Sequence, residues 1–446
     1  MRPHKAISLI ALAYCILTFL YAVLVPPWET PDEPAHYRYA AQLAARWRPP
    51  ADPGVRQKDR FCRDYEFISS NYEWYHPALG YLPAALGYKV VELFSPYSLP
   101  AEIPPLNPPF CDDPFHHPPL FSHGALVPVL VWKDAWGLLI VRIFSSVGGL
   151  VVIFAAYQIG RCLRMGDLAP IAAAWIAFLP QFTFISASVR NDTLANAIGA
   201  LLFLLIALMQ IAPERCKRYS LITGGLLGIG LLTKLTLAYL YPAAFLAIIL
   251  STRWKPRQWI RPVMYMLISG SAVTILYYAA YEEARSALIY TINQMKINPE
   301  LFSWFYIRRI PAMLVDLFFA RFGWANIVVP SLWIGAALVT WIIGVLLSVS
   351  RGILIRKEEP TTVRILFILA FGLLLAIAGI FRYNLSHFQP QGRFLFPALV
   401  CWALLGTWGF SRLSNRRVGR IIGISTAVFM FLFNLRALIL LWATYY

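Results

Sequence analysis

Apolar runs of about twenty residues recur along the whole 446-residue chain. Each run is long enough to cross a hydrocarbon core about 30 Å thick. In such a core every backbone polar group needs a partner, and a helix supplies partners within one segment. The composition agrees, because 59% of the residues are hydrophobic and only 14% are charged, against about 25% charged in a soluble domain. The sequence therefore predicts an all-α polytopic membrane protein, with residues 1–446 forming a single membrane domain.

These apolar runs predict eleven transmembrane helices, at 6–25, 136–160, 168–189, 193–211, 220–233, 235–250, 263–281, 329–349, 365–381, 394–411 and 421–441. The stretch 220–250 is too long for one untilted span and short for two. We interpret it as two short helices that turn at Lys234, because a single span would place the basic segment that follows on the wrong side.

The distribution of Lys and Arg predicts the orientation. Six alternate segments, starting with the N-terminus, hold 19 of the 39 Lys and Arg residues. Cytoplasmic loops of membrane proteins collect these residues, so we expect a cytoplasmic N-terminus, an outer C-terminus and a location in the cytoplasmic membrane. The net charge of +17 then follows from topology. Because the basic residues are scattered and form no continuous stripe, we expect no nucleic-acid partner.

The first apolar run also resembles a signal peptide. No small-residue cleavage pattern follows it, which favours an uncleaved first span.

Two predicted outer connections are much longer than the others. We expect a first outer loop at 26–135 and a second at 282–328, which together would cover the outer face. Loops beyond about 15 residues are usually functional or disordered, and the abundance of aromatic and aliphatic residues argues against disorder. Residues 76–94 have one apolar side and predict an interfacial helix or, alternatively, a short additional span.

The first outer loop contains two cysteines, Cys62 and Cys111. A disulfide is compatible with an oxidising compartment, but the sequence leaves their pairing open. The stretch DDPFHHPPL (112–120) has the composition of a metal site without the spacing of zinc ligands, so we expect a structured loop there.

Directly after the first span, the segment PPWETPDEPAHYRY (26–39) places Asp32, Glu33 and His36 between prolines. We expect the prolines to hold this backbone out of a helix, so that the two carboxylates turn toward a cavity. The simpler alternative is a solvated turn.

Further charged residues lie at the predicted outer ends of other helices: Arg190 and Asp192 after the third span, Lys234 at the next turn, and His387, Gln391 and Arg393 before the tenth span. Carboxylates and cations gathered in this way can bind an anionic substrate and remove a proton from a hydroxyl group. Asp32 and Asp192 are candidate ligands for one divalent cation, with oxygen ligands that suit Mg²⁺ or Mn²⁺.

Each of these residues also has an ordinary structural interpretation. Asp192, followed by Thr193, is suited to cap the fourth helix. Lys234 can extend to the membrane interface. Arg393, near a helix start, is opposed by the helix dipole, which favours a ligand or a partner for its charge.

Several stretches, in this order, are similar to those of a known group of proteins: PDEPAHYRYA, HPALGYLPAAL, LPQFTFISASVRNDTLAN, LLTKLTLAYL, ARFGW and QGRFLFP. Together with one span, a long outer loop that opens on Asp-Glu, and many further spans, they resemble the GT-C superfamily of lipid-dependent glycosyltransferases. Within it, the chain resembles a bacterial family of predicted membrane proteins known only as a domain of unknown function.

The resemblance implies a GT-C-like bundle and transfer of a sugar from a polyprenyl-phosphate-linked donor to a glycan, lipid or protein acceptor on the outer side of the membrane. It implies that Asp32 is the general base, with Glu33 and His36 orienting it or the acceptor. The second outer acid of the superfamily corresponds to Asp192. The segment has Asn191-Asp192 where paired acids are usual, and Phe394 where many relatives have Tyr.

A departing lipid phosphate gains negative charge, which cations at the outer helix ends stabilise. A cation buried in a membrane protein needs such a partner, so we expect Arg142, Arg190, Lys234 and Arg393 to bind the donor phosphate. The main alternative is a secondary transporter of an envelope precursor or a small anionic solute, with Asp192 and Lys234 as coupling groups. A non-catalytic scaffold for envelope assembly is a third interpretation. The sequence contains no convincing repeat of the kind that transporters often show.

Overall fold

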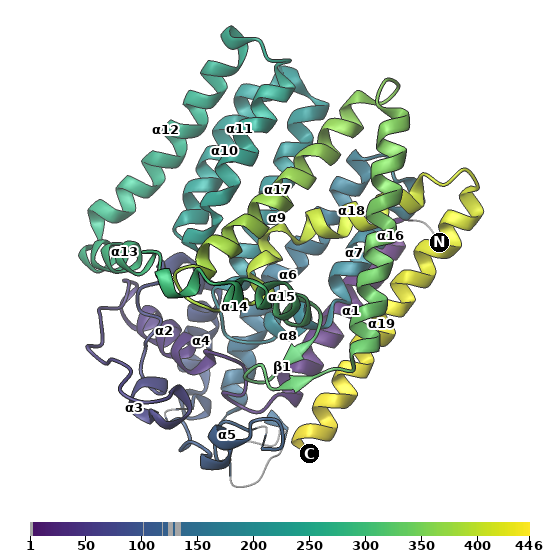
Figure 1. Cartoon of the computed structure of the whole chain (residues 1–446). Helices are drawn as coiled ribbons and strands as arrows, with labels where there is room; N and C mark the ends of the chain where they lie inside the picture. Colours follow the sequence, from purple (N-terminus) through teal and green to yellow (C-terminus); the bar gives the residue numbers. More distant parts are fainter. Residues whose placement is uncertain (1–2, 101, 118, 124–127, 130–134) are drawn as a thin grey trace.

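The computed structural model describes residues 3–100, 102–117, 119–123, 128–129 and 135–446. The remaining positions of the predicted first outer loop (101, 118, 124–127 and 130–134) lie outside the described residues. A bundle of long helices forms one part of the molecule, and a layer of loops and short helices covers one end of that bundle (Figure 1). The all-α fold expected from the apolar runs is confirmed, since the described strands have two residues each.

The bundle consists of α1 (Pro3–Leu24), α6 (Trp136–Cys162), α7 (Ala169–Ala177), α8 (Pro180–Ser186), α9 (Asp192–Ile211), α10 (Cys216–Leu231), α11 (Leu240–Ser251), α12 (Pro256–Ala280), α16 (Ser331–Ile355), α17 (Pro360–Asn384), α18 (Leu399–Ser411) and α19 (Arg416–Tyr445). Short 3₁₀ helices η5 (Gly166–Leu168), η6 (Pro213–Arg215), η7 (Leu235–Tyr239) and η9 (Gly392–Ala398) lie between some of them.

Each of the eleven predicted runs coincides with helical segments, but a count of eleven spans is not confirmed. Among the described residues, eight helices are long and apolar enough to cross a membrane, or nine if the bent pair Gly166–Ala177 and Pro180–Ser186 forms one span. The region 220–250 does divide at Thr233–Lys234 into α10 and the η7–α11 segment, as expected. These two pieces are shorter than the other spans, because Lys234 has an extended backbone that ends helical hydrogen bonding.

The predicted span 168–189 is broken into α7 and α8, which are inclined at 63°. Pro180 explains the break, because proline disfavours a helical conformation in the residue before it, and Leu179 is extended. The break leaves the Phe178 carbonyl available, and Asn434 of α19 donates hydrogen bonds to it (3.2 Å) and to the Thr183 hydroxyl (2.8 Å). A buried amide thus replaces part of the helical hydrogen bonding that Pro180 interrupts.

Both long connections gather at the same end of the bundle, near the C-terminus (Figure 1). The first long loop (26–135) contains α2 (Glu33–Arg46), η1 (Phe61–Arg63), α3 (Tyr65–Ile68), η2 (Ala78–Tyr81), α4 (Leu82–Phe94), η3 (Pro96–Ser98) and α5 (Pro108–Asp112). The second long loop (282–328) contains α13 (Glu282–Gln294), η8 (Pro299–Leu301), α14 (Trp304–Ile307), α15 (Arg309–Phe319) and the hairpin of β1 (Arg321–Phe322) and β2 (Ile327–Val328).

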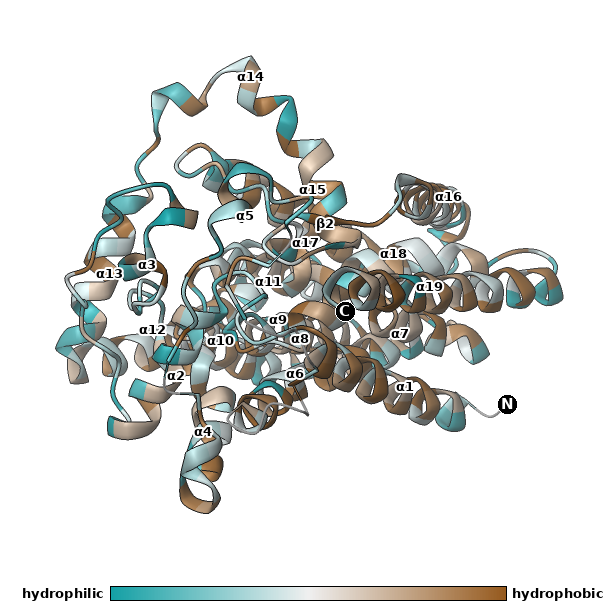
Figure 2. Ribbon diagram, turned by 90° about the horizontal axis from the view of Figure 1, so that it is seen from below, coloured by the Kyte–Doolittle hydropathy of each residue, from teal (hydrophilic) through white to brown (hydrophobic). Residues whose placement is uncertain are grey.

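Hydrophilic residues concentrate in these loops, whereas α1, α16 and α19 are mainly hydrophobic, as Figure 2 shows from the loop end of the molecule. Helix α4, within the predicted interfacial segment 76–94, leaves Leu86, Val90 and Leu93 exposed, while Lys89 and Glu92 form an ion pair at 2.5 Å. Its 13 residues are too few to cross a membrane, so it fits an apolar-sided helix at the interface.

A disulfide joins Cys62 and Cys111, so the pairing that the sequence left open is present. It connects η1 to α5, and Arg63 pairs with Asp112 beside it at 3.1 Å. A small apolar core that includes Trp28, Ile68 and Phe121 lies beneath this connection. Residues of the stretch 112–120 contribute to the described loop, where His116 pairs with Asp113 on the surface. The first long loop therefore has a packed interior of its own.

Candidate active site

The segment after the first span does not stay out of a helix, which corrects the expectation drawn from its prolines. Helix α2 begins at Glu33, with Pro34 in its first turn, where a missing backbone N–H costs little. Asp32 precedes the helix with φ of 65°, a left-handed conformation that Asp adopts more readily than most residues. This bend directs the side chains of Asp32 and Glu33 apart, so the two carboxylates have different neighbours.

Glu33 is completely buried and binds Arg142 of α6. Its carboxylate accepts hydrogen bonds from Arg142 Nε (2.8 Å) and Nη2 (2.5 Å) and from the backbone N–H groups of Trp28 and Val189. Arg142 also donates to three backbone carbonyls at the end of α1, those of Ala22, Val25 and Pro26. All five of its N–H groups are thereby used. The sequence predicted that Arg142 binds the donor phosphate. In the structure its hydrogen-bond donors are instead used by Glu33 and by backbone carbonyls of the same chain.

Asp32 is the more accessible of the two acids, with 19% of its side chain exposed. Its carboxylate accepts a hydrogen bond from the Tyr72 hydroxyl (3.0 Å) and another from Arg393 Nη2 (2.8 Å). Burial, followed by the negative charges of Asp32 and Glu73, raises the pKa of Tyr72 well above 10. The Tyr72 hydroxyl therefore keeps its proton and remains a donor to Asp32. The alternative of a solvated turn therefore does not describe this segment.

Asp192 lies in the first turn of α9 and forms an ion pair with Lys234. Asn191 occupies the N-cap position and no side chain caps this helix end, so capping does not explain Asp192. Arg190 Nη1 lies 3.9 Å and Arg393 Nη1 4.0 Å from the Asp192 carboxylate. Lys234 is buried rather than extended to the surface. The structure thus brings three other predicted site residues, Arg190, Lys234 and Arg393, together around Asp192.

Phe394 lies beside this group. Lys234 Nζ is 5.3 Å and the Arg393 guanidinium carbon 5.7 Å from the centre of its ring. A cation near an aromatic ring is attracted by the negative charge of the ring face. The phenyl ring at a position where many GT-C relatives have Tyr therefore still contacts both cations, although it provides no hydroxyl.

Two glycines allow the chain segments of the site to approach each other. A Cβ atom at Gly80 would lie 2.7 Å from both the Cβ of Asn191 and the carbonyl oxygen of Thr233. A Cβ atom at Gly392, next to Arg393, would lie 2.2 Å from the backbone nitrogen of Phe318 in α15. Both distances are below van der Waals contact. The first long loop therefore packs directly on the turns that carry Asp192 and Lys234, and α15 packs on the segment that carries Arg393.

The cations in this group are not saturated by hydrogen bonds. Arg190 donates to the Ser188 hydroxyl and to the Pro31 carbonyl. Within the described residues, however, no hydrogen-bond partner is found for Arg190 Nη1 or for Arg393 Nε and Nη1, although these atoms are buried. Three cations (Arg190, Lys234 and Arg393) face two carboxylates (Asp32 and Asp192). The unused, buried donors of these cations suit an anionic ligand.

The same arrangement does not suit a metal ion shared by Asp32 and Asp192. Arg393 donates to Asp32 and lies 4.0 Å from Asp192, so its guanidinium already occupies the space between the two acids. A divalent cation there would be repelled by this charge. Among the described residues, a different set brings possible ligand atoms within 4.8 Å of one another: Asp32, His36 and Glu73. The predicted pair for Mg²⁺ or Mn²⁺ is therefore not supported by the geometry.

His36 is buried on the inner side of α2, where its Nδ1 atom lies 2.7 Å from the Tyr81 hydroxyl. Burial, and then the positive charges of His76, Arg393 and Lys234, holds the pKa of His36 well below 6.5. The imidazole is therefore neutral near pH 7. Glu73, also nearly buried, has Oε2 at 2.6 Å from His76 Nε2.

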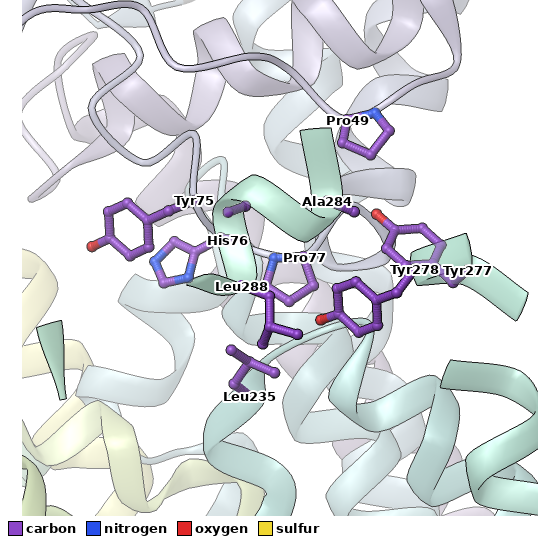
Figure 3. A pocket seen from close by; sticks show the side chains of 10 residues that line it. Pro49, Tyr75, His76, Pro77, Leu235, Tyr277, Tyr278, Ala284 and Leu288 are labelled. Carbon is purple, nitrogen blue, oxygen red and sulfur yellow. The ribbon is translucent and has the colours of Figure 1, made fainter. Parts of the chain in front are cut away.

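A pocket opens beside this histidine–glutamate pair (Figure 3). Tyr75, His76 and Pro77 of the first long loop form one wall. Tyr277 and Tyr278 at the end of α12 form another, and Leu288 of α13 and Leu235, the neighbour of Lys234, complete it. The lining is apolar and aromatic with a few polar groups, but the cavity volume is only about 10 Å³, room for about one water molecule, so this is a narrow crevice between the two long loops.

The segment NYEWYH (71–76) supplies Tyr72, Glu73 and His76, which the sequence did not single out. The available signal was an acid and a histidine among aromatic residues in a loop that carries other ionisable groups. This pattern does not predict which helix ends the segment 71–76 contacts. His387, in contrast, was singled out in the sequence, and in the structure its Nε2 atom lies 3.2 Å from Gln294 Oε1.

Comparison with known proteins gives one family match. Residues 116–280 match the model of the family described as dolichyl-phosphate-mannose-protein mannosyltransferase. The chain resembles GT-C membrane glycosyltransferases. The expected resemblance to this superfamily is confirmed, whereas membership of the narrower bacterial family of unknown function is not. The match covers Arg142, Arg190, Asp192 and Lys234 but begins after Asp32. It supports a glycosyltransferase and a multi-pass membrane protein.

Two crystal structures of the Archaeoglobus fulgidus oligosaccharyltransferase are also similar to the GT-C-like chain. The apo form has a TM-score of 0.49 and 14% identity, over 99% of this chain and 56% of that chain. The form tethered through a disulfide to an acceptor peptide containing the NVT sequon has a TM-score of 0.45 and 13% identity, over 98% and 55%. The chain thus spans little more than half the length of that protein. No curated protein matches it.

Proposed function

We propose that the protein transfers a sugar from a polyprenyl-phosphate-linked donor to an acceptor on the outer side of the cytoplasmic membrane. The observation that carries this proposal is the meeting of Asp32 with Arg393, next to Asp192, Lys234 and Arg190. A carboxylate that can accept a proton and a cationic group that can bind a phosphate are the two components that such a transfer needs.

The donor site in this proposal is the cationic group around Asp192. A phosphodiester carries one negative charge, which the three cations of this group attract. Its oxygens would accept hydrogen bonds from Arg393 Nε and Nη1 and from Arg190 Nη1, the buried donors without partners among the described residues. As the bond between sugar and phosphate breaks, negative charge grows on the phosphate and these interactions strengthen. Arg142 has no part in this step, because Glu33 and backbone carbonyls use its donors.

Asp32 is the general base in this proposal. Its side chain is more exposed than those of Glu33 and Asp192, so an acceptor hydroxyl can reach it. Tyr72 and Arg393 hold the carboxylate in place. When Asp32 takes the proton of the acceptor hydroxyl, the oxygen attacks the sugar carbon and the lipid phosphate leaves. Glu33 positions α2 and thereby Asp32, and His36 supports the same helix through Tyr81.

The acceptor would approach between the two long loops, along the crevice lined by Tyr75, Tyr277 and Tyr278 (Figure 3), which must widen to admit it because its cavity volume is only about 10 Å³. Tyrosine combines an apolar ring with a polar hydroxyl, so these side chains suit contact with a glycan, a lipid head group or a protein segment once the crevice widens. His76 lies both on the pocket wall and against Glu73, and this pair connects the pocket to the surroundings of Asp32. The two long loops, at 26–135 and 282–328, would then form the outer-face cover of a single membrane domain.

The proposal is tested with the full-length protein in vesicles supplied with a polyprenyl-phosphate sugar and a panel of glycan, lipid and peptide acceptors. We expect sugar transfer with release of polyprenyl phosphate, and its loss in Asp32→Asn. Movement of the sugar or another anion across the vesicle without release of polyprenyl phosphate would contradict the proposal and indicate a transporter.

A further inference from the structure

The ring of Tyr72, whose hydroxyl donates to Asp32 at 3.0 Å, lies among other aromatic side chains. Phe67 of α3 stacks on this ring, with ring centres 4.7 Å apart and planes inclined at 17°. Phe61 of η1 meets the same ring edge-on, with centres 6.0 Å apart. Both arrangements are favourable ones for aromatic pairs. The direction of the hydroxyl that holds Asp32 is therefore set by the packing of its own ring.

A fourth ring at this place comes from the second long loop. Trp324 lies in the turn between β1 and β2. Its ring centre is 5.2 Å from that of Phe61, and its Nε1–H group donates to the Trp28 carbonyl at 3.2 Å. Both long loops thus contribute to one aromatic cluster, which consists of Phe61, Phe67, Tyr72 and Trp324.

The hairpin that carries Trp324 is attached on two sides. The backbone N–H of Arg321 donates to the side-chain oxygen of Gln181 in α8 at 2.8 Å. The side-chain amide of Asn326 donates to the carbonyl of Pro114, in the first long loop, at 2.8 Å. The hairpin therefore connects the bundle to the first long loop, and Trp324 lies between these two attachments along the chain.

The orientation of the Asp32 carboxylate depends on two donors, one for each oxygen. Tyr72 donates to Oδ1 and Arg393 Nη2 donates to Oδ2. Without Tyr72, the carboxylate can rotate until both oxygens accept from the guanidinium, which is the bidentate arrangement that arginine favours. A displacement of about 1 Å at a reacting group can lower a rate by about 10². The Tyr72 hydroxyl therefore keeps one oxygen of Asp32 directed away from Arg393.

We propose that Trp324 is a positioning residue for Asp32 and acts through Phe61 and Tyr72. The inference rests on the proposed role of Asp32 as the general base, and it adds a role for the second long loop in the orientation of that base. Asp32 has its active orientation only while the hairpin of the second long loop packs on the first. The two loops then do more than enclose the site, because their contact sets the geometry of the chemical step.

The first test measures transfer by the full-length protein in vesicles, for variants with matched expression and thermal unfolding temperature. Tyr72→Phe should lower kcat about 10–100-fold with no change in donor KM, because positioning affects the chemical step. Trp324→Leu should lower kcat about 2–10-fold, which corresponds to the loss of one aromatic pair. Trp324→Phe keeps a ring against Phe61 and should retain most of the rate. Trp304→Leu is the control, because Trp304 is in the same loop and is 74% exposed.

A double substitution tests whether Trp324 acts through Tyr72. The Tyr72→Phe variant already lacks the hydroxyl that holds Asp32, so addition of Trp324→Leu should change kcat by less than about twofold. Effects that multiply would show that the two residues act independently, which would overturn the proposal. Normal kcat in Trp324→Leu, or an equal loss in Trp304→Leu or Trp324→Phe, would overturn it as well.

A second measurement does not need sugar transfer. The Asp32 carboxylate is labelled with a carbodiimide and a small amine, and the rate is followed by mass spectrometry of its peptide. We expect Tyr72→Phe and Trp324→Leu to change this rate in the same direction, and the double variant to match Tyr72→Phe. The same rate in Trp324→Leu as in the wild type contradicts the inference. If the wild-type protein transfers no sugar, the proposed function fails, and the labelling still decides whether Trp324 positions Asp32.

Discussion

Asp32 and Glu33 are adjacent residues whose substitution by the matching amide has opposite consequences. Asp32→Asn keeps the shape of the side chain and its contact with Tyr72 but removes the proton acceptor and one charge partner of Arg393, which still has Asp192 at 4.0 Å. We expect transfer to fall by about 10² or more, the usual contribution of a general base, while the thermal unfolding temperature stays close to that of the wild type. Glu33→Gln leaves Arg142 buried with an unpaired charge. We expect a loss of stability of about 3–5 kcal/mol.

The two variants are compared at matched expression by turnover and by thermal unfolding in detergent. Normal transfer by Asp32→Asn would show that this carboxylate is structural. A well-folded but inactive Glu33→Gln would instead assign the chemistry to Glu33, and would mean that its pairing with Arg142 is broken during the reaction.

Arg393 and Lys234 should govern donor affinity. Hydrogen bonds to charged groups contribute about 1.5–3 kcal/mol, so Arg393→Ala and Lys234→Ala are each expected to weaken donor binding roughly 10–100-fold, measured by titration of a polyprenyl-phosphate sugar. Arg412→Ala is a matched control. Arg412 follows α18, at the opposite end of the span that Arg393 begins, and is paired with Glu359 at 2.7 Å. An equal loss of affinity in Arg412→Ala would indicate a general structural effect.

The sequence predicted part of this group because each member stands at the end of an apolar run. Arg190, Asp192, Lys234 and Arg393 could be assigned to one side of a membrane by counting spans alone. Glu73 could not be assigned, because the path of the first long loop depends on tertiary contacts such as the close approach of Gly80 to Asn191. The role of Arg142 was missed for a similar reason, since its partner Glu33 is 109 residues away.

At the scale of secondary structure, apolar length predicted where helices lie better than where they end. Pro180 was visible in the sequence, but the run 168–189 is apolar on both sides of it and was therefore predicted as one span. The structure adds that Asn434 donates hydrogen bonds to the groups that the break leaves without helical partners. Pro34 was misinterpreted, because a proline excluded from the middle of a helix is accepted in its first turn. Both errors concern proline, whose effect depends on its position within the helix.

The disulfide between Cys62 and Cys111 should stabilise the first long loop locally. It joins η1 to α5 across 49 residues, and a disulfide of such a loop length contributes about 2–4 kcal/mol. We expect reduction, or a Cys62→Ser and Cys111→Ser double substitution, to increase proteolysis within residues 50–120 without exposing the bundle. Cys15→Ser is the control, since this cysteine of α1 is not bonded to another. Free alkylation of Cys62 and Cys111 in the unreduced protein would contradict the pairing.

The contact between α12 and α13 provides a test of the acceptor pocket. Leu288→Trp places a larger side chain among Tyr277, Tyr278 and His76 and should fill the pocket. Overpacking costs about 1–3 kcal/mol, so we expect KM for the acceptor to rise roughly 10–100-fold, with little change in donor affinity. Ile289→Trp, on the exposed face of the same helix, is the control. A change in donor affinity with no change in acceptor KM would remove the pocket from the acceptor path.

For the whole molecule, the two ends of the bundle differ in their connecting segments. Both long loops, including α2, which Asp32 directly precedes, lie at one end, and the basic segment that joins α18 to α19 lies at the other (Figure 1). Because Lys and Arg collect on the cytoplasmic side, the loop end should face outward. An impermeant thiol reagent on intact cells tests this with Ala51→Cys and Ser414→Cys, both exposed positions, in protein whose four free cysteines are replaced.

We expect labelling at position 51 on intact cells and at position 414 only after the membrane is opened. The reverse pattern would place Asp32 and the cationic group in the cytoplasm. There, nucleotide-activated sugars are available and a lipid-borne donor is no longer required. The orientation therefore also bears on the donor. With the loop end outside, a membrane-anchored phosphate is the anion most accessible to the buried cations, so the kind of donor follows from the side of the membrane on which the site lies.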